Sequence, residues 1–140
     1  MPFSLLTLGV SDVDRSADFY VAAGFDRPPG PVGLVLLRTI GTVIALHPWT
    51  DLADDAAMPS EGPTWVFRGV SMASNQGSRA DVDAAYTRWM AAGGSALKPP
   101  RVTSWGGYAG YVADPDGHLW ELAHNPFLDF PAAGGFVVHA

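Results

Sequence analysis

The sequence predicts one α+β domain, residues 1–140, built from two halves that repeat the same order of elements. A chain of 140 residues fits a single domain of ordinary size. Two stretches with helical spacing of apolar residues each lie among strand-like segments. Each stretch begins with a hydroxyl residue three positions before a carboxylate and ends at glycine: Ser11 matches Ser78, and Gly24 matches Gly93. The order strand, helix, three strands therefore occurs twice, as a repeat of pattern rather than of residues.

Composition excludes several classes of protein. The chain has no Cys, which removes disulfides, Cys-based metal sites and thiol nucleophiles, and which suits a reducing cytoplasm. The net charge of −6 opposes nucleic-acid binding. An acidic surface suits a cationic ligand, but solubility explains the charge equally well. The N-terminus lacks the pattern of a signal peptide, and the most apolar stretch, Val32 to Leu46, is too short to span a bilayer. We expect a cytoplasmic protein without membrane or nucleic-acid partners.

The first half is interpreted as a βαβββ unit, although the residues place only three of its four strands. Residues 4–10 predict a strand, and the capping box at 11–14 predicts the start of a helix that stops at Gly24. Two further strands are expected at 33–37 and 42–47.

The second half follows a polar, Pro-rich stretch at 48–63, which we interpret as a linker between modules of about 1–50 and 64–126. A strand is expected within 64–74, with its register left open, and a helix at 79–92.

Three more strands complete the second module. A short one is expected at 95–98, and the pair 108–113 and 118–124 is joined by the turn Asp-Pro-Asp-Gly at 114–117. Asp-Gly favours a hairpin because glycine adopts positive φ, and Asp residues bond their own backbone in such turns.

Several segments together resemble the vicinal oxygen chelate superfamily, which includes glyoxalase I, bleomycin-resistance proteins and extradiol dioxygenases. The segments are Leu8 to Val13 with Arg15-Ser16 and Phe19-Tyr20, Ala92 to Gly94, and Gly107 to Glu121 with its DPDGxxxE pattern. The resemblance implies paired βαβββ modules that form an open, partly closed mixed β-barrel. It also implies a homodimer and a small-molecule site in the cleft.

Metal enzymes of this family place ligands on the first and last strands of each module, so the sequence can be tested for them. The first-strand position falls near Leu5, and residues 3–10 contain no His, Asp, Glu or Cys. Residues 64–74 contain no His or carboxylate, and the counterpart of Glu121 in the first half is Ala45. One carboxylate does not hold a divalent ion tightly. We expect no metal site and no cofactor.

Glu121 and His47 are the candidate catalytic residues. A Glu between Trp120 and Leu122 is costly to bury unless it is paired, so it either faces a wet cleft or anchors the structure. His47 lies two residues from Ala45 and would share its face, where it could act as acid or base with Glu121. The alternative is a solvated histidine at a strand end.

The remaining ligand-binding candidates are Trp105, Tyr108 and Tyr111, which gather near a Gly-Gly loop, together with Thr7 on the first strand. Aromatic side chains line many small-molecule pockets, but core packing is an equal alternative here. His118 follows the turn and is expected to be exposed.

Two functions remain open. The first is a metal-independent small-molecule-binding protein with its ligand in the barrel cleft. The second is a glyoxalase-like enzyme, of lyase, isomerase or dioxygenase type, that acts on a small oxygenated substrate with Glu121 as base. The sequence contains no phosphate-cradling Gly loop, no GxSxG and no HExxH.

Overall fold

Two mixed β-sheets and three helices make up the part of the chain that the computed structural model describes, residues 3–30 and 33–129. The helices are α1 (Val13–Ala23), α2 (Trp49–Asp55) and α3 (Arg79–Ala91). The strands are β1 (Leu5–Val10), β2 (Val35–Arg38), β3 (Val43–Pro48), β4 (Met72–Asn75), β5 (Ser95–Val102), β6 (Tyr108–Ala113) and β7 (Leu119–His124). None of the described helices is long and apolar enough to cross a membrane.

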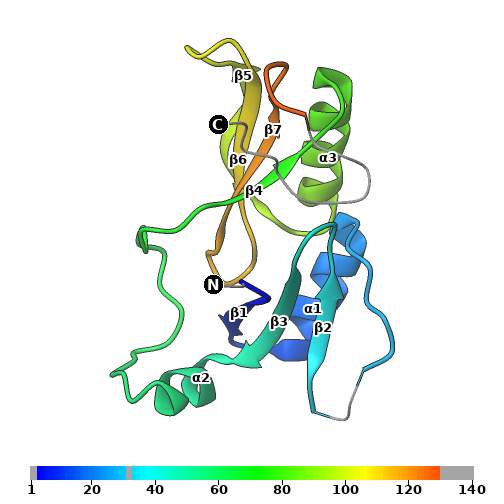
Figure 1. Cartoon of the computed structure of the whole chain (residues 1–140). Coiled ribbons are helices and arrows are strands. Elements are labelled where there is room, and N and C mark those ends of the chain that lie inside the picture. The colour runs from blue at the N-terminus through cyan, green and yellow to red at the C-terminus, as the bar shows by residue number, and fades with distance from the viewer. Residues whose placement is uncertain (1–2, 31–32, 130–140) are drawn as a thin grey trace.

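The sheets follow the two halves of the sequence, one below the other in Figure 1. The first has the order β1-β3-β2 and the second the order β4-β7-β6-β5. In each sheet the strand before the helix pairs in parallel with the last strand of its half. The α+β class is confirmed, but over the described ranges the sheets do not close into a barrel.

The two halves differ in one strand. The second half has the full βαβββ order, whereas the first has βαββ and a single bridge between Asp26 and Arg38 where another strand would pair. Pro28 and Pro29, which follow that bridge, lack the N–H groups that a ladder needs. Two complete βαβββ modules are therefore not confirmed.

Both long helices begin and end close to the predicted positions. Ser78 caps α3 as expected and accepts a hydrogen bond from the Asp81 backbone N–H at 3.1 Å. At α1 the cap is Asp12, not the predicted Ser11, because Ser11 is bound to Asp116 instead. Gly24 ends α1 with φ of 108°, a conformation that suits glycine.

The connection between the halves departs most from prediction. Within the expected linker at 48–63, residues 49–55 form α2, although α2 has no side-chain cap. Its support is tertiary: a Cβ at Gly9 of β1 would lie only 3.2 Å from the Trp49 ring, so glycine lets this helix approach the strand. The expected strand at 64–74 is confirmed only from Met72, and residues 64–71 form no strand.

The last three strands follow the prediction more closely. β6 has the predicted bounds, and β7 begins one residue later than expected. β5 extends beyond the predicted 95–98 to Val102, through Pro99 and Pro100. It lies at the sheet edge, and its pairing with β6 shifts register across the prolines, where a ladder hydrogen bond is not needed.

The hydrophobic core lies between the helices and one face of each sheet, and it joins the two halves. Aromatic side chains from α1, α3 and β7 meet there: the rings of Phe19 and Trp89 lie edge to face at 5.3 Å, and those of Trp89 and Trp120 are tilted against each other at 5.5 Å. Tyr20 is fully buried among them. Such contacts add stability beyond the area that they bury.

Candidate functional site

The Asp-Pro-Asp-Gly turn between β6 and β7 binds the first half of the chain through Asp116. The Asp116 carboxylate is almost fully buried and accepts hydrogen bonds from the Ser11 backbone and hydroxyl, from the Ser16 hydroxyl and from Arg15. Burial alone would raise the pKa of this carboxyl, but the donors from Ser11, Ser16 and Arg15 hold it below its ordinary value. Asp116 is therefore a structural anion whose charge the protein itself satisfies.

Asp114 fastens the same turn to the core. Its carboxylate accepts the Tyr20 hydroxyl at 2.7 Å and the backbone N–H groups of Asp116 and His118. The Tyr20 oxygen in turn accepts the Trp120 indole N–H at 3.2 Å. Burial raises the pKa of the Asp114 carboxyl, and it raises that of the Tyr20 hydroxyl well above its ordinary value. These bonds fix the backbone that carries the next residue, His118.

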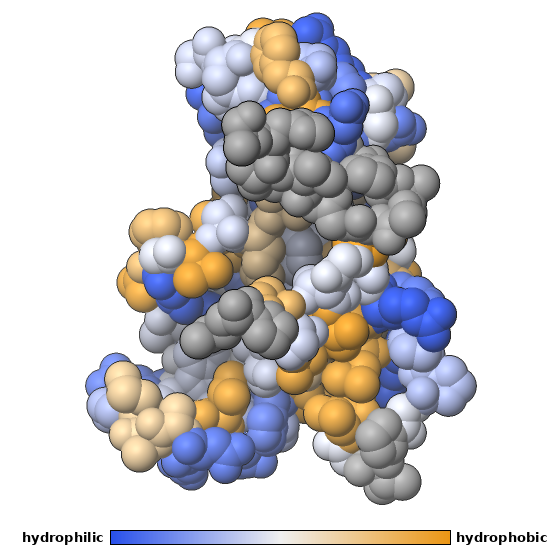
Figure 2. Space-filling model, viewed as in Figure 1, coloured by the Kyte–Doolittle hydropathy of each residue, from blue (hydrophilic) through white to orange (hydrophobic). Residues whose placement is uncertain are grey.

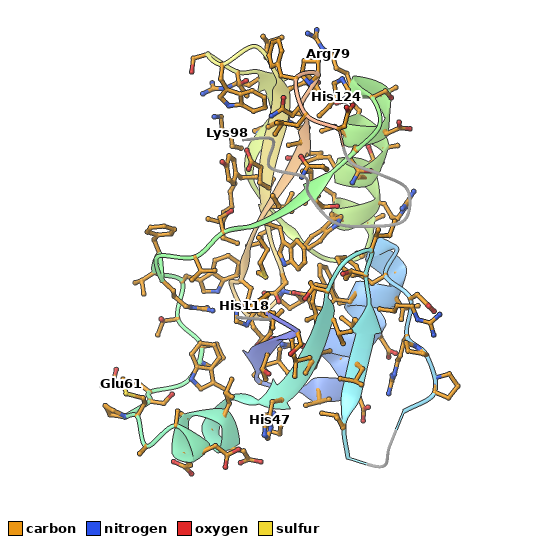
Figure 3. All side chains as sticks on the ribbon, in the orientation of Figure 1. His47, Glu61, Arg79, Lys98, His118 and His124 are labelled. Atoms are coloured by element: carbon orange, nitrogen blue, oxygen red, sulfur yellow. The ribbon has the colours of Figure 1, made fainter. Side chains whose placement is uncertain are left out.

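His118 connects β1 to the segment before β4, and the prediction that it is exposed is wrong. Its Nε2 lies 2.7 Å from the carbonyl oxygen of Gly9, and its Nδ1 lies 2.9 Å from Nη1 of Arg68. A carbonyl only accepts and a guanidinium only donates, so Nε2 carries the proton and Nδ1 accepts. The bonding pattern therefore assigns the neutral imidazole. Figure 3 shows His118 beside β1, near the middle of the molecule.

Arg68 is held against the turn and an aromatic ring. Its Nη2 donates to the backbone oxygens of Thr64 and Asp116, and its Cζ lies 4.7 Å from the centre of the Trp49 ring. Gly117 makes this approach possible: its φ is 80°, and a Cβ there would come within 3.0 Å of Nη2. Trp49, Arg68 and His118, from three separate elements, thus form one cluster.

This cluster lies in the wall of an apolar pocket of about 430 Å³. The pocket is formed by β1, α2, the segment 56–70 and the start of β7. Its larger lining side chains are Leu6, Leu8, Trp49, Leu52, Met58, Val66, Phe67, Arg68, Val70, Met72, His118 and Leu119. A cavity of this size and character suits a small molecule.

The rim of the pocket is exposed and hydrophobic. Met58, Val66, Phe67 and Val70 line the pocket and are 57–76% exposed. Figure 2 shows hydrophobic surface on this projecting segment at the left of the molecule, and more over β2 and β3. Large exposed apolar side chains that gather in one place mark surfaces that bind something.

The predicted site residues do not all come together. Thr7 lines the pocket, while His47 lies beside α2, with Nε2 3.4 Å from Asp55 Oδ2. Tyr108 donates its hydroxyl to Asp83 of α3 at 2.8 Å. Trp105 is half-exposed and packs on Gly107. The roles given to these residues remain predictions.

Glu121 and Tyr111 form a separate polar row on the sheet face opposite the core. Tyr111 pairs with Glu121 on one side and with Lys98 on the other, and Lys98 Nζ lies 5.8 Å from the Tyr111 ring. Burial and the Glu121 carboxylate raise the pKa of the Tyr111 hydroxyl. No hydrogen bond or ion pair joins His47 to Glu121 in the described chain. Lys98 belongs to the same row as Glu121, and Figure 3 shows His47 at the opposite end of the molecule from Lys98.

The residues around Glu121 do not fit a catalytic divalent ion. Strand register places Ala73 beside Glu121 and Thr7 beside Ala45, and none of these three neighbours is a His or a carboxylate. No group of three or more His, Asp, Glu or Cys residues gathers anywhere in the described ranges. Holding a divalent ion requires several convergent deprotonated ligands, and this set offers one.

Sequence reasoning missed Trp49, Leu52 and Arg68 as pocket residues. They fall in segments interpreted as linker and strand, so no periodic pattern assigned them to a face. One signal was available: Arg68 is the one Lys or Arg residue between Arg38 and Arg79. The odd spacing of Tyr108 and Tyr111 also predicts that they point to opposite faces of a strand.

Comparison with known proteins assigns the family. The sequence profile of the Glyoxalase/Bleomycin resistance protein/Dioxygenase superfamily matches residues 3–122. The chain belongs to this superfamily. An uncharacterized protein of Mycobacterium bovis is 34% identical over 123 residues, which cover 82% of this chain and 78% of that protein.

Solved structures of the superfamily agree with the assignment. A glyoxalase-related enzyme from Fulvimarina pelagi is 31% identical, with a TM-score of 0.87 and coverage of 99% of both chains. A glyoxalase/bleomycin resistance protein/dioxygenase from Nocardioides is 25% identical, with a TM-score of 0.71, over 89% of this chain and 83% of that one. The superfamily resemblance in the sequence is thereby confirmed.

Proposed function

We propose that this protein binds a small, largely apolar molecule without the help of a metal ion, and that the ligand occupies the pocket between β1, α2 and the segment 56–70. The observation that carries the proposal is the pocket itself, about 430 Å³ with aromatic and aliphatic walls and a polar cluster in one of them. Drug-sized ligands occupy cavities of roughly 300–1,000 Å³ with this make-up. The superfamily to which the chain belongs includes bleomycin resistance proteins, which suits a function of this class.

The exposed hydrophobic side chains at the rim support the proposal, because a bound ligand would bury them. Phe67 is 76% exposed and Val66 is 65% exposed, although both line the pocket. A ligand that covers such side chains gains roughly 25 cal/mol for each Å² of apolar area removed from water.

Direct titration with N-phenylnaphthylamine, an uncharged dye that fluoresces in apolar sites, tests the proposal. We expect saturable binding to the wild-type protein and at least a roughly 10-fold loss in Ala53→Phe, since Ala53 lines the pocket. The matched control is Ala22→Phe, which places the same side chain on the exposed face of α1. Absence of saturable binding, or equal binding by both variants, would contradict the proposal.

The alternative is a glyoxalase-like enzyme with Glu121 as base. Two observations favour it: the Fulvimarina pelagi relative is described as a glyoxalase-related enzyme, and Glu121 lies beside Tyr111 on a face away from the core. A turnover screen with small carbonyl and oxygenated substrates, on wild type and Glu121→Gln, tests this reading. Turnover by the wild type that Glu121→Gln abolishes would establish the enzymatic function. If no substrate is turned over, the binding function remains the proposal.

We also propose a homodimer, as the superfamily resemblance implies, in the cytoplasm, which the absence of Cys suits. The exposed apolar side chains of the segment 56–70, and those of Leu34 and Ile40 on either side of β2, are compatible with a partner surface. Sedimentation velocity at several concentrations would measure the mass, and a monomer at all of them would remove the dimer.

A further inference from the structure

We infer that the pocket selects ligands with an anionic oxygen group, and that Arg68 is the specificity-determining residue. This inference rests on the proposed function, because it names the class of ligand for the same pocket. It differs from the cationic ligand that an acidic surface would suit.

The charge lining the pocket is positive and isolated. Among the described residues that form its wall, Arg68 is charged and no Asp or Glu is present. No carboxylate of the described chain makes a salt bridge with Arg68; the nearby Asp116 carboxylate is taken by Arg15 and two serines. Partly buried charges in proteins are normally paired, so an unpaired guanidinium beside a cavity indicates a partner supplied from outside.

The hydrogen bonds of Arg68 are also incomplete. Its partners are neutral: the His118 ring and the backbone oxygens of Thr64 and Asp116. A guanidinium carries more N–H donors than these bonds use, and Nε is buried without a partner in the described chain. The carbonyl oxygens of Thr64 and Asp116 use both Nη2 hydrogens, so the free donors are Nε–H and one hydrogen of Nη1. An oxyanion accepts such a donor in a charge-assisted hydrogen bond, which is stronger than a bond to a neutral acceptor.

The guanidinium is held in place before any ligand arrives. The Trp49 ring lies against one side of it, and His118 and the carbonyl oxygens bind its edge. The His118 tautomer supports this arrangement, because Nδ1 can only accept while Nε2 donates to Gly9. A fixed donor loses little entropy on binding, which favours selectivity. At moderate salt, the repulsion between an anionic ligand and acidic groups elsewhere on the surface is largely screened at distances beyond about 10 Å.

Three probes with one apolar skeleton test the inference: phenylbutyrate, phenylbutanol and phenylbutylamine, each used to displace N-phenylnaphthylamine at neutral pH. We expect phenylbutyrate to bind about 10-fold more tightly than phenylbutanol, with phenylbutylamine weakest. Arg68→Gln is expected to bring the acid within about 2-fold of the alcohol while the alcohol itself changes little. The matched control Arg101→Gln removes the same charge from an exposed position on β5, outside the pocket, and should keep the preference.

The outcomes separate the inference from the proposed function. If the dye and the alcohol bind but the acid has no advantage in wild type, or keeps its advantage in Arg68→Gln, the anion inference is overturned and the pocket stands. If neither the dye nor any of the three probes binds, the proposed function and the anion inference both fail. Should Arg68→Gln not fold, the wild-type ranking and Arg68→Lys decide: Lys keeps the charge but loses the planar fork, and it should retain part of the preference.

Discussion

Asp116 and Arg68 lie at the same turn, yet the protein treats their charges in opposite ways. The Asp116 carboxylate receives donors from Ser11, Arg15 and Ser16, whereas the Arg68 guanidinium meets only neutral groups. Asp116 is almost fully buried and Arg68 only half-buried, at the edge of a pocket. The difference separates two roles at this turn: Asp116 holds the halves of the chain together, whereas Arg68 keeps the free donors that we propose for a ligand.

Removal of Asp116 should therefore have the largest effect on stability. Asp116→Ala leaves the Ser11 and Ser16 donors and Arg15 without their acceptor, and we expect a loss of about 3 kcal/mol in the free energy of unfolding. Urea denaturation measures it. Asp18→Ala, at an exposed position on α1, is the control and should change stability by less than about 0.5 kcal/mol. Equal effects of the two substitutions would remove Asp116 as the anchor.

Acid should remove the contribution of Asp116. Its folded pKa is lowered, so an unfolded Asp, with a pKa of about 3.9, binds its proton first as the pH falls. The stability that it provides is complete above that value and is lost as the pH falls through the folded pKa. The unfolding free energies of wild type and Asp116→Asn should differ by a constant amount above about pH 5 and converge below about pH 4.

The raised pKa of Asp114 acts with the opposite sign, because the folded state then binds the proton first. Asp114 is present in both proteins of the comparison, and the Asp116 charge is the smallest of the causes of its raised pKa, so most of its contribution cancels in the difference. A difference that stays constant into acid, or widens, would show that the Asp116 charge is not what the donors stabilise.

Loss of Arg68 should cost less stability than loss of Asp116. Arg68→Gln removes hydrogen bonds to neutral groups and the contact with Trp49, and we expect a decrease of about 1 kcal/mol. Thermal unfolding without ligand measures it, with Arg101→Gln as the control of equal charge. A decrease as large as that of Asp116→Ala would make Arg68 a structural residue and would erase the contrast between the two.

The smallest expected effect is that of Glu121→Gln on ligand binding. Glu121 lies with Tyr111 and Lys98 on the sheet face outside the pocket lining. The substitution should change the affinity for N-phenylnaphthylamine and for phenylbutyrate by less than about 2-fold. A larger loss in the titration would move the site to the cleft that the sequence suggested.

Local signals in the sequence were sufficient for α3, α1 and β6. Ser78 acts through its hydroxyl on the backbone N–H three residues away, and Gly24 acts through its own backbone conformation, so neither effect depends on the rest of the fold. The Asp-Pro-Asp-Gly turn was likewise readable. The wider role of the turn could not be predicted, because Asp116 binds Ser11, which lies about a hundred positions away in the sequence. No local sequence pattern indicates so distant a partner.

The pocket could not be predicted from the sequence, for a related reason. Its wall depends on α2, which forms because Trp49 and Leu52 pack over Gly9 and not because of a cap. Arg68 lay within a predicted strand, where its direction depended on a register that the sequence left open. The superfamily resemblance directed attention to Glu121 and His47, which the structure places apart from the pocket lining.

A crystal structure of the wild-type protein with phenylbutyrate tests the central claim most directly. The account predicts the phenyl group between α2 and the segment 56–70, with the carboxylate at hydrogen-bond distance, about 3 Å, from the Arg68 guanidinium. A ligand bound instead beside Glu121 and Tyr111, or one that lies in the pocket with its carboxylate turned away from Arg68, would contradict it.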